Sequence, residues 1–155
     1  MSMVAYLCAM SDADSAVLAG LGENEWFDAV YERRPFDMDK AWDGIHYVLT
    51  RASGPTPDVR SLAIFGGDEW GHETGYGRVR KLAAADVVRV SQVLSATSFD
   101  EIRANFDPEV MNADVYPSCW GEEEWGVDVL QHYYPKLVEF YRRAAERGDC
   151  VLQWI

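Results

Sequence analysis

The stretch from about residue 123 to residue 147 constrains the fold more than any other part of the sequence. Its apolar side chains recur at alternating intervals of three and four residues, at Val127, Leu130, Tyr134, Leu137, Tyr141 and Ala144. This spacing predicts one long helix with a single apolar face. Gly148 follows as a C-cap, and residues 150–155 predict a closing strand. Pro135 lies inside the stripe, so we expect it to kink or split the helix.

Shorter elements precede this helix, and helices outnumber strands among them. Strands are expected at residues 3–9 and 61–65, and helices at 13–21, 25–31, 39–51, 83–96, 99–106 and from Asp107-Pro108 onward. Ser11 and Ser98 are placed to cap two of these helices. The strands do not alternate regularly with helices, which argues against a doubly wound sheet. We therefore predict an α+β fold: a single compact domain, residues 1–155, with a small mixed or antiparallel sheet packed with several helices.

The net charge of -12 is the strongest feature of the composition. Between Phe99 and Pro135, nine acids accompany a single basic residue, Arg103. Such a field repels nucleic acid and anionic membranes and attracts basic proteins. The alternative is that the charge serves solubility alone. No apolar run approaches the roughly 20 residues of a membrane helix, and three scattered cysteines are too few for a disulfide framework. These features favour a cytoplasmic protein with neither a nucleic-acid nor a membrane partner.

The helix expected at residues 39–51 holds the first candidate site. Its apolar arc consists of Ala41, Trp42, Ile45, Val48 and Leu49. His46 lies at the border of this arc, three residues after Asp43, so the carboxylate can reach the imidazole and favour its charged form. Such a pair could handle protons. The alternative is a border histidine that fixes the helix through one hydrogen bond. Gly44, which is unfavourable in a helix, indicates close packing of the backbone.

Residues 66–77 hold a second candidate site. Five glycines in twelve residues predict a long loop rather than regular structure. Trp70 has little apolar company there and is the best candidate for an exposed contact residue. Backbone N–H groups near Tyr76, joined by the Arg78 guanidinium, could hold an anion. The alternative is that Arg78 is a surface arginine paired with an acid.

The sequence indicates no other chemistry. It contains no phosphate-binding loop, dinucleotide fingerprint, nucleophile elbow or zinc-binding pair. We therefore expect no metal and no cofactor. Cys119 is expected to be a small packing residue. The remaining tryptophans that flank apolar runs are expected to be fully or partly in the core: Trp26, Trp42, Trp120 and Trp125.

Four segments carry a family resemblance. They are Lys40-Ala41-Trp42-Asp43-Gly44-Ile45-His46-Tyr47, Gly75-Tyr76-Gly77-Arg78, Tyr116-Pro117-Ser118-Cys119-Trp120, and the ending from Ala144 to Leu152. In these segments and their order, the chain resembles the YfbM-like family, small bacterial proteins grouped under a domain of unknown function. The resemblance covers nearly the whole chain. It implies a single α+β domain in the bacterial cytoplasm, and it implies no activity. Pro135 and the run Glu122-Glu123-Glu124 depart from the family's pattern.

Two functions of different classes remain open. The first is a binding module that docks a basic protein partner or a small polar ligand, as an immunity-type inhibitor of a basic toxin would. The second is an enzyme with a site between helix 39–51 and loop 66–77. There Asp43 and His46 would handle protons, Tyr76 and Arg78 would hold a polar group, and Trp70 would close over it. A buried His46 would exclude this enzyme site. We favour the first function, because no motif supports a reaction.

Overall fold

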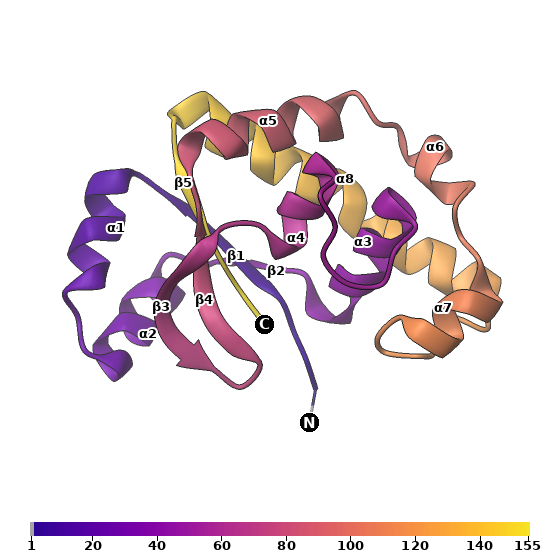
Figure 1. Cartoon of the computed structure of the whole chain (residues 1–155), viewed down its shortest axis with the longest axis horizontal. Coiled ribbons are helices and arrows are strands. Elements are labelled where there is room, and N and C mark those ends of the chain that lie inside the picture. The colour runs from indigo at the N-terminus through magenta and orange to yellow at the C-terminus, as the bar shows by residue number, and fades with distance from the viewer. Residues whose placement is uncertain (1) are drawn as a thin grey trace.

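The computed structural model describes residues 2–155 and has a five-stranded antiparallel sheet at its centre (Figure 1). The strands are β1 (Tyr6–Met10), β2 (Phe36–Asp37), β3 (Asp68–Thr74), β4 (Gly77–Leu82) and β5 (Cys150–Trp154). Their order across the sheet is β2-β1-β5-β4-β3, so the first and last long strands are neighbours. The α+β prediction is confirmed, and the sheet is antiparallel rather than mixed.

Helices account for most of the rest of the chain. They are α1 (Asp12–Ala19), α2 (Glu23–Glu32), α3 (Trp42–Thr50), α4 (Leu62–Phe65), α5 (Ala84–Ser95), α6 (Phe99–Arg103), α7 (Pro108–Asp114) and α8 (Glu123–Arg147), with 3-10 turns η1 (Asp39–Ala41) and η2 (Val59–Ser61). The side chains of Ser11, Ser98 and Asp107 accept backbone N–H groups at the starts of α1, α6 and α7. Within residues 2–155, we find no helix with the length and apolar character that a membrane crossing requires.

The sheet separates two cores, because side chains alternate between its faces. Leu7 and Val151 point to one face and belong to the larger core with α3, α5 and α8. Cys8 and Leu152 point to the other and pack with Trp26 and other residues of α1 and α2. Figure 1 shows α1 and α2 on one side of the sheet and the remaining helices on the other.

The long helix predicted at the C-terminal end is confirmed as α8, and Gly148 ends it with a φ of 70°. Tyr141 is fully buried, and its hydroxyl donates a hydrogen bond to the carbonyl of Ala63 at 2.7 Å. Pro135 lies within α8 but does not split it. Its exposed position explains this, because the carbonyl that loses its helical partner, on exposed Gln131, can bond to water.

The strand predicted at residues 61–65 is wrong, since the segment forms the end of η2 and the short helix α4. Ala63 and Ile64 are both buried although they are consecutive. A strand buried on both faces and a short buried helix give the same apolar run. Local sequence therefore could not distinguish the two.

The loop predicted at residues 66–77 is also wrong, because β3 and β4 form a hairpin there. The register shifts between Glu69 and Glu73, which marks a bulge. Gly71 lies within this irregular part, where a Cβ would be only 3.0 Å from the Cβ of Val79. Gly77 begins the return strand with a φ of 123°. The glycines therefore allow a tight, irregular hairpin rather than preventing strands.

Candidate interaction surface

His46 on α3 is fully buried, so it does not face an open pocket. Its Nδ1 lies 3.2 Å from the carbonyl of Ala52, and its Nε2 lies 2.8 Å from the hydroxyl oxygen of Ser61. A carbonyl only accepts, so Nδ1 carries the proton and Nε2 accepts from Ser61. Burial lowers the pKa of His46, against the opposing influence of its bond to Ala52. A neutral imidazole thus ties α3 to η2 and the loop between them.

Asp43 does not pair with His46, so that prediction is wrong. Its Oδ2 accepts a hydrogen bond from the backbone N–H of Tyr116 at 2.8 Å. Burial raises the pKa of Asp43, and the bond from Tyr116 opposes this shift. Trp42, one residue earlier, stacks on the ring of Tyr116, with centroids 5.8 Å apart. The polar edge of α3 therefore holds the loop after α7 in place.

The other three candidates, Trp70, Tyr76 and Arg78, lie on the hairpin instead of covering α3. Trp70 is partly buried, and its ring centroid lies 6.5 Å from that of Trp26 in the core beneath α2. Tyr76 is 42% exposed at the turn. Arg78 is exposed and pairs with Glu73 at 3.4 Å, so it is the surface arginine paired with an acid that was the alternative to an anion site. Because His46 is sealed against η2, it cannot share an open cleft with Arg78, and the enzyme site that required this cleft is excluded.

An exposed aromatic residue, which the sequence pattern did not indicate, lies at the start of α8. Trp125 was expected to be fully or partly in the core but is 44% exposed, whereas Trp120 is fully buried. Their ring centroids are 5.9 Å apart. Cys119 was expected to pack inside, but it is exposed beside them. Local sequence does not distinguish the two tryptophans, since each is directly followed by a glycine.

Trp125 borders a largely apolar groove of about 370 Å³. The groove is lined by Asp39, Lys40, Ala41, Pro117, Cys119, Trp120, Trp125, Val129 and Tyr133. A second hollow of about 490 Å³ shares Cys119 and Trp125 with it and adds the exposed acid Glu122. The indole of Trp125 thus lies between two concave surfaces, with apolar walls on one side and a carboxylate on the other.

Exposed acids are frequent in the segments that precede and follow Trp125 in the chain. They are Asp100, Glu101, Asp107, Glu109, Asp114, Glu122, Glu124 and Asp128, and together with the Trp125 groove we call them the acidic surface. They come from α6, α7 and the beginning of α8, which gather at one end of the molecule (Figure 1). Within residues 2–155, none of these carboxylates takes part in an ion pair; the described ion pairs involve acids elsewhere. In the same range, no three His, Cys, Asp or Glu side chains are grouped to hold a metal ion.

The fold defines a class: an α+β protein with a five-stranded antiparallel sheet and a long C-terminal helix followed by a closing strand. The chain belongs to the family described as a domain of unknown function, DUF1877, whose model matches residues 1–154. It is similar in structure to YfbM from Escherichia coli, a protein of unknown function, with a TM-score of 0.76, 22% sequence identity and 99% of each chain covered. The resemblance stated from sequence is therefore confirmed. Among curated proteins, none matches this chain.

Proposed function

We propose that this protein is a binding module that docks a basic segment of a partner protein on its acidic surface. The observation that supports this proposal is the indole of Trp125, which is 44% exposed at the edge of an apolar groove. The acids of the acidic surface form no ion pair with any of the described basic residues. Carboxylates without ion-pair partners and an exposed aromatic ring are together complementary to lysine and arginine.

Two physical effects would bring a basic segment to the acidic surface. The acids, within a net charge of -12, raise the local concentration of a cationic partner and orient its approach. The groove then provides affinity at short range, because a lysine or arginine can place its aliphatic stem on apolar walls and its charged head over an indole. Tryptophan is also among the residues that most often dominate binding energy at interfaces. An immunity-type inhibitor of a basic toxin is one protein that would use such a surface.

The test compares capture of basic proteins by the wild type and three purified variants at low and physiological salt. Trp125→Ala removes the aromatic anchor and leaves the charge unchanged. A triple variant neutralises Glu122, Glu124 and Asp128. The matched control neutralises three exposed acids of α2 instead, at Glu23, Asp28 and Glu32.

We expect a basic protein that the wild type and the α2 control retain and that both surface variants lose. Its affinity should decrease steeply with salt. The proposal is wrong if no basic protein is retained at low salt, or if the triple variant on α8 and the α2 control lose the partner equally. Equal loss would mean that net charge alone, and no particular surface, causes binding.

A further inference from the structure

A second concave region lies at the other end of α8, where the helix passes the free side of β1. Two adjoining cavities of about 460 Å³ and 450 Å³ share Ala9, Phe36, Phe140 and Arg147. Each is within the size range of small-molecule sites. We call their union the β1 groove. We propose that the β1 groove binds a small organic anion: a carboxylate or similar group attached to an apolar body.

Basic residues are concentrated here in an otherwise acidic protein. Five of the 14 Lys and Arg side chains of the chain line the β1 groove: Arg33, Arg34, Lys136, Arg143 and Arg147. Two acids face them. Glu139 accepts hydrogen bonds at 2.7 Å from both Arg142 and Arg143, which holds its pKa down to about 2. Asp37, the other acid, forms no ion pair among the described residues, and its Oδ1 accepts a hydrogen bond from the backbone N–H of Asp39.

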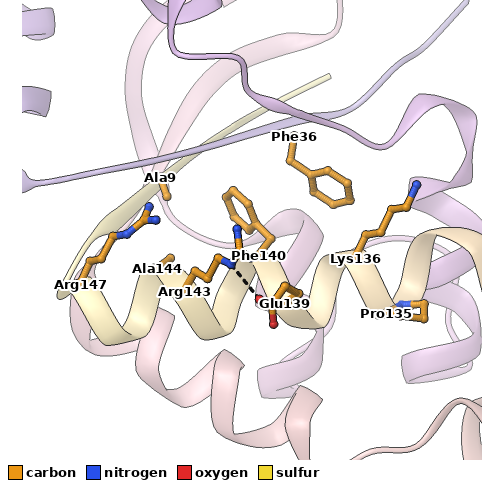
Figure 2. A pocket seen from close by; sticks show the side chains of 9 residues that line it. All are labelled: Ala9, Phe36, Pro135, Lys136, Glu139, Phe140, Arg143, Ala144 and Arg147. Atoms are coloured by element: carbon orange, nitrogen blue, oxygen red, sulfur yellow. Dashed lines mark hydrogen bonds and ion pairs between the residues drawn. The ribbon is translucent and has the colours of Figure 1, made fainter.

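Three of the five cations are available to a ligand. Within residues 2–155, Arg34, Lys136 and Arg147 have no carboxylate at ion-pair distance. The Lys136 amine instead lies 2.9 Å from Nε2 of His132. In Figure 2 the Arg147 side chain extends from α8 toward Ala9 on β1. Burial raises the pKa of Asp149, just after α8, and the nearby charge of Arg147 opposes this shift.

The walls between these cations are apolar. Phe36 stacks on Phe140, with ring centroids 5.7 Å apart and planes 26° from parallel. Ala9, Pro135 and Ala144 complete the lining on either side of this pair (Figure 2). A ligand body of aromatic or acyl character can therefore lie against the rings while its charged end reaches a guanidinium. Apolar walls with a few placed polar groups are the usual composition of such sites.

The backbone of Ala9 adds a neutral donor. Ala5 accepts a hydrogen bond from Met38 and donates one to Asp39, so its N–H and C=O face β2. In an antiparallel ladder alternate residues face the same neighbour, so Leu7 and Ala9 face this side too. The pairing with β2 stops at Leu7. The N–H of Ala9 therefore points to the open edge where the cations lie, and an anion there would accept both neutral and charge-assisted hydrogen bonds.

The test uses 2-naphthoate as the probe, with 2-naphthamide as a neutral molecule of the same shape. Binding is measured by calorimetry, and the contact residues are mapped by amide shifts in two-dimensional NMR of the full chain. Octanoate replaces the aromatic body by an acyl chain. Arg147→Gln removes one groove cation, Ala9→Leu fills the shared floor without changing charge, and Arg89→Gln on α5 is the charge-matched control.

We expect 2-naphthoate and octanoate to shift the backbone amide signals of Ala9, Phe36 and Phe140. The neutral 2-naphthamide should bind at least about tenfold more weakly. Arg147→Gln should weaken binding about tenfold, and Arg89→Gln by less than about twofold. Ala9→Leu should abolish binding in a protein whose thermal midpoint stays near that of the wild type; if that variant unfolds, Arg147→Gln alone decides. Equal affinity for naphthamide, shifts located away from β1, or equal losses in the two arginine variants would each overturn the proposal.

Discussion

Helix α3 and the acidic surface contain the most suggestive polar and aromatic residues of this protein, and their roles are opposite. On α3, Asp43 and His46 have the spacing of a proton-transfer pair, yet each hydrogen-bonds to a separate loop inside the fold. At the acidic surface no motif is present, yet Trp125 and eight carboxylates are exposed. Polar residues on a largely apolar helix are more often held by the core, whereas an exposed large aromatic residue remains available to a partner.

The neighbouring tryptophans test this contrast most strongly. Trp120 is fully buried, and its indole donates to the carbonyl of Val115 at 3.2 Å. We expect Trp120→Ala to lower the free energy of unfolding by about 3–5 kcal/mol, because it removes a large core side chain and leaves a cavity. Urea unfolding followed by far-UV circular dichroism measures this. A loss of unfolding free energy below about 1 kcal/mol would show that the packing around Trp120 tolerates the cavity and does not hold the acidic surface rigidly.

Asp43→Ala should cost about 2 kcal/mol, because the backbone N–H of Tyr116 loses its acceptor in a partly buried setting. Asp43→Asn retains an oxygen that can accept this bond and carries no charge to desolvate, so it should cost less. Unfolding of the two variants in urea gives the difference. Equal losses would indicate that the charge of Asp43 matters and not its acceptor role.

Gly44→Ala tests how closely α3 approaches the same loop. A Cβ at Gly44 would lie 2.5 Å from Cζ2 of Trp120 and 3.2 Å from Cδ2 of Leu130. The overlap should outweigh the gain in helix propensity and leave a net loss of about 1–2 kcal/mol. Gly75→Ala is the control, because no neighbouring atom lies within 4 Å of its Cβ position. The thermal midpoints of the two variants should differ by several degrees; a stabilised Gly44→Ala would contradict the packing.

His46 predicts a pH dependence of stability. Its pKa is lowered by burial and partly restored by its bond to Ala52 and by the charge of Asp58. The unfolded chain therefore takes up this proton first, near pH 6.5, and the free energy of unfolding should fall as the pH drops below that value. The slope is at most about 1.4 kcal/mol per pH unit. Asp43, whose pKa burial raises, acts in the opposite sense in more acidic solution.

Unfolding in urea at about pH 7.5 and about pH 5.5 checks the role of His46, with His46→Gln as the variant that cannot titrate. The wild type should lose more stability between the two conditions than His46→Gln does. The same loss in both proteins would assign the pH dependence to other groups.

Trp125→Ala should have the smallest effect on folding, less than about 1 kcal/mol, because almost half of the side chain is already in water. Unfolding in urea, followed as for Trp120→Ala, measures it. A loss comparable with that of Trp120→Ala would make Trp125 a core residue and remove the contrast between the two regions.

The sequence predicted the parts of the fold in which local pattern and tertiary packing agree. The helices now seen as α5 and α8 follow from apolar spacing, and Ser11 and Ser98 mark two helix starts correctly. The β3–β4 hairpin was missed because many glycines show that the backbone can adopt many conformations and do not show which one it adopts. The chain at residues 61–65 was missed because a short apolar run fits either element when both of its faces are covered.

The candidate site could be predicted only in its charge. The excess of acids between residues 99 and 135 is visible in the sequence. The exposure of Trp125 is not, because it depends on Trp120 filling the space beside Gly44. The burial of His46 likewise depends on Ser61, which is 15 residues away in the chain. Both depend on long-range packing, which cannot be inferred from the local pattern of a single sequence.

Charged side chains are unevenly distributed along helix α8. Its 25 residues span roughly 37 Å at 1.5 Å per residue. Exposed Glu124 and Asp128 lie near its start, and Arg147 lies in its last turn. These charges oppose the dipole of the helix backbone, whose positive end is the N-terminus, and so they stabilise α8. A charged partner that approaches at low ionic strength therefore meets charges of opposite sign at the two ends of this helix.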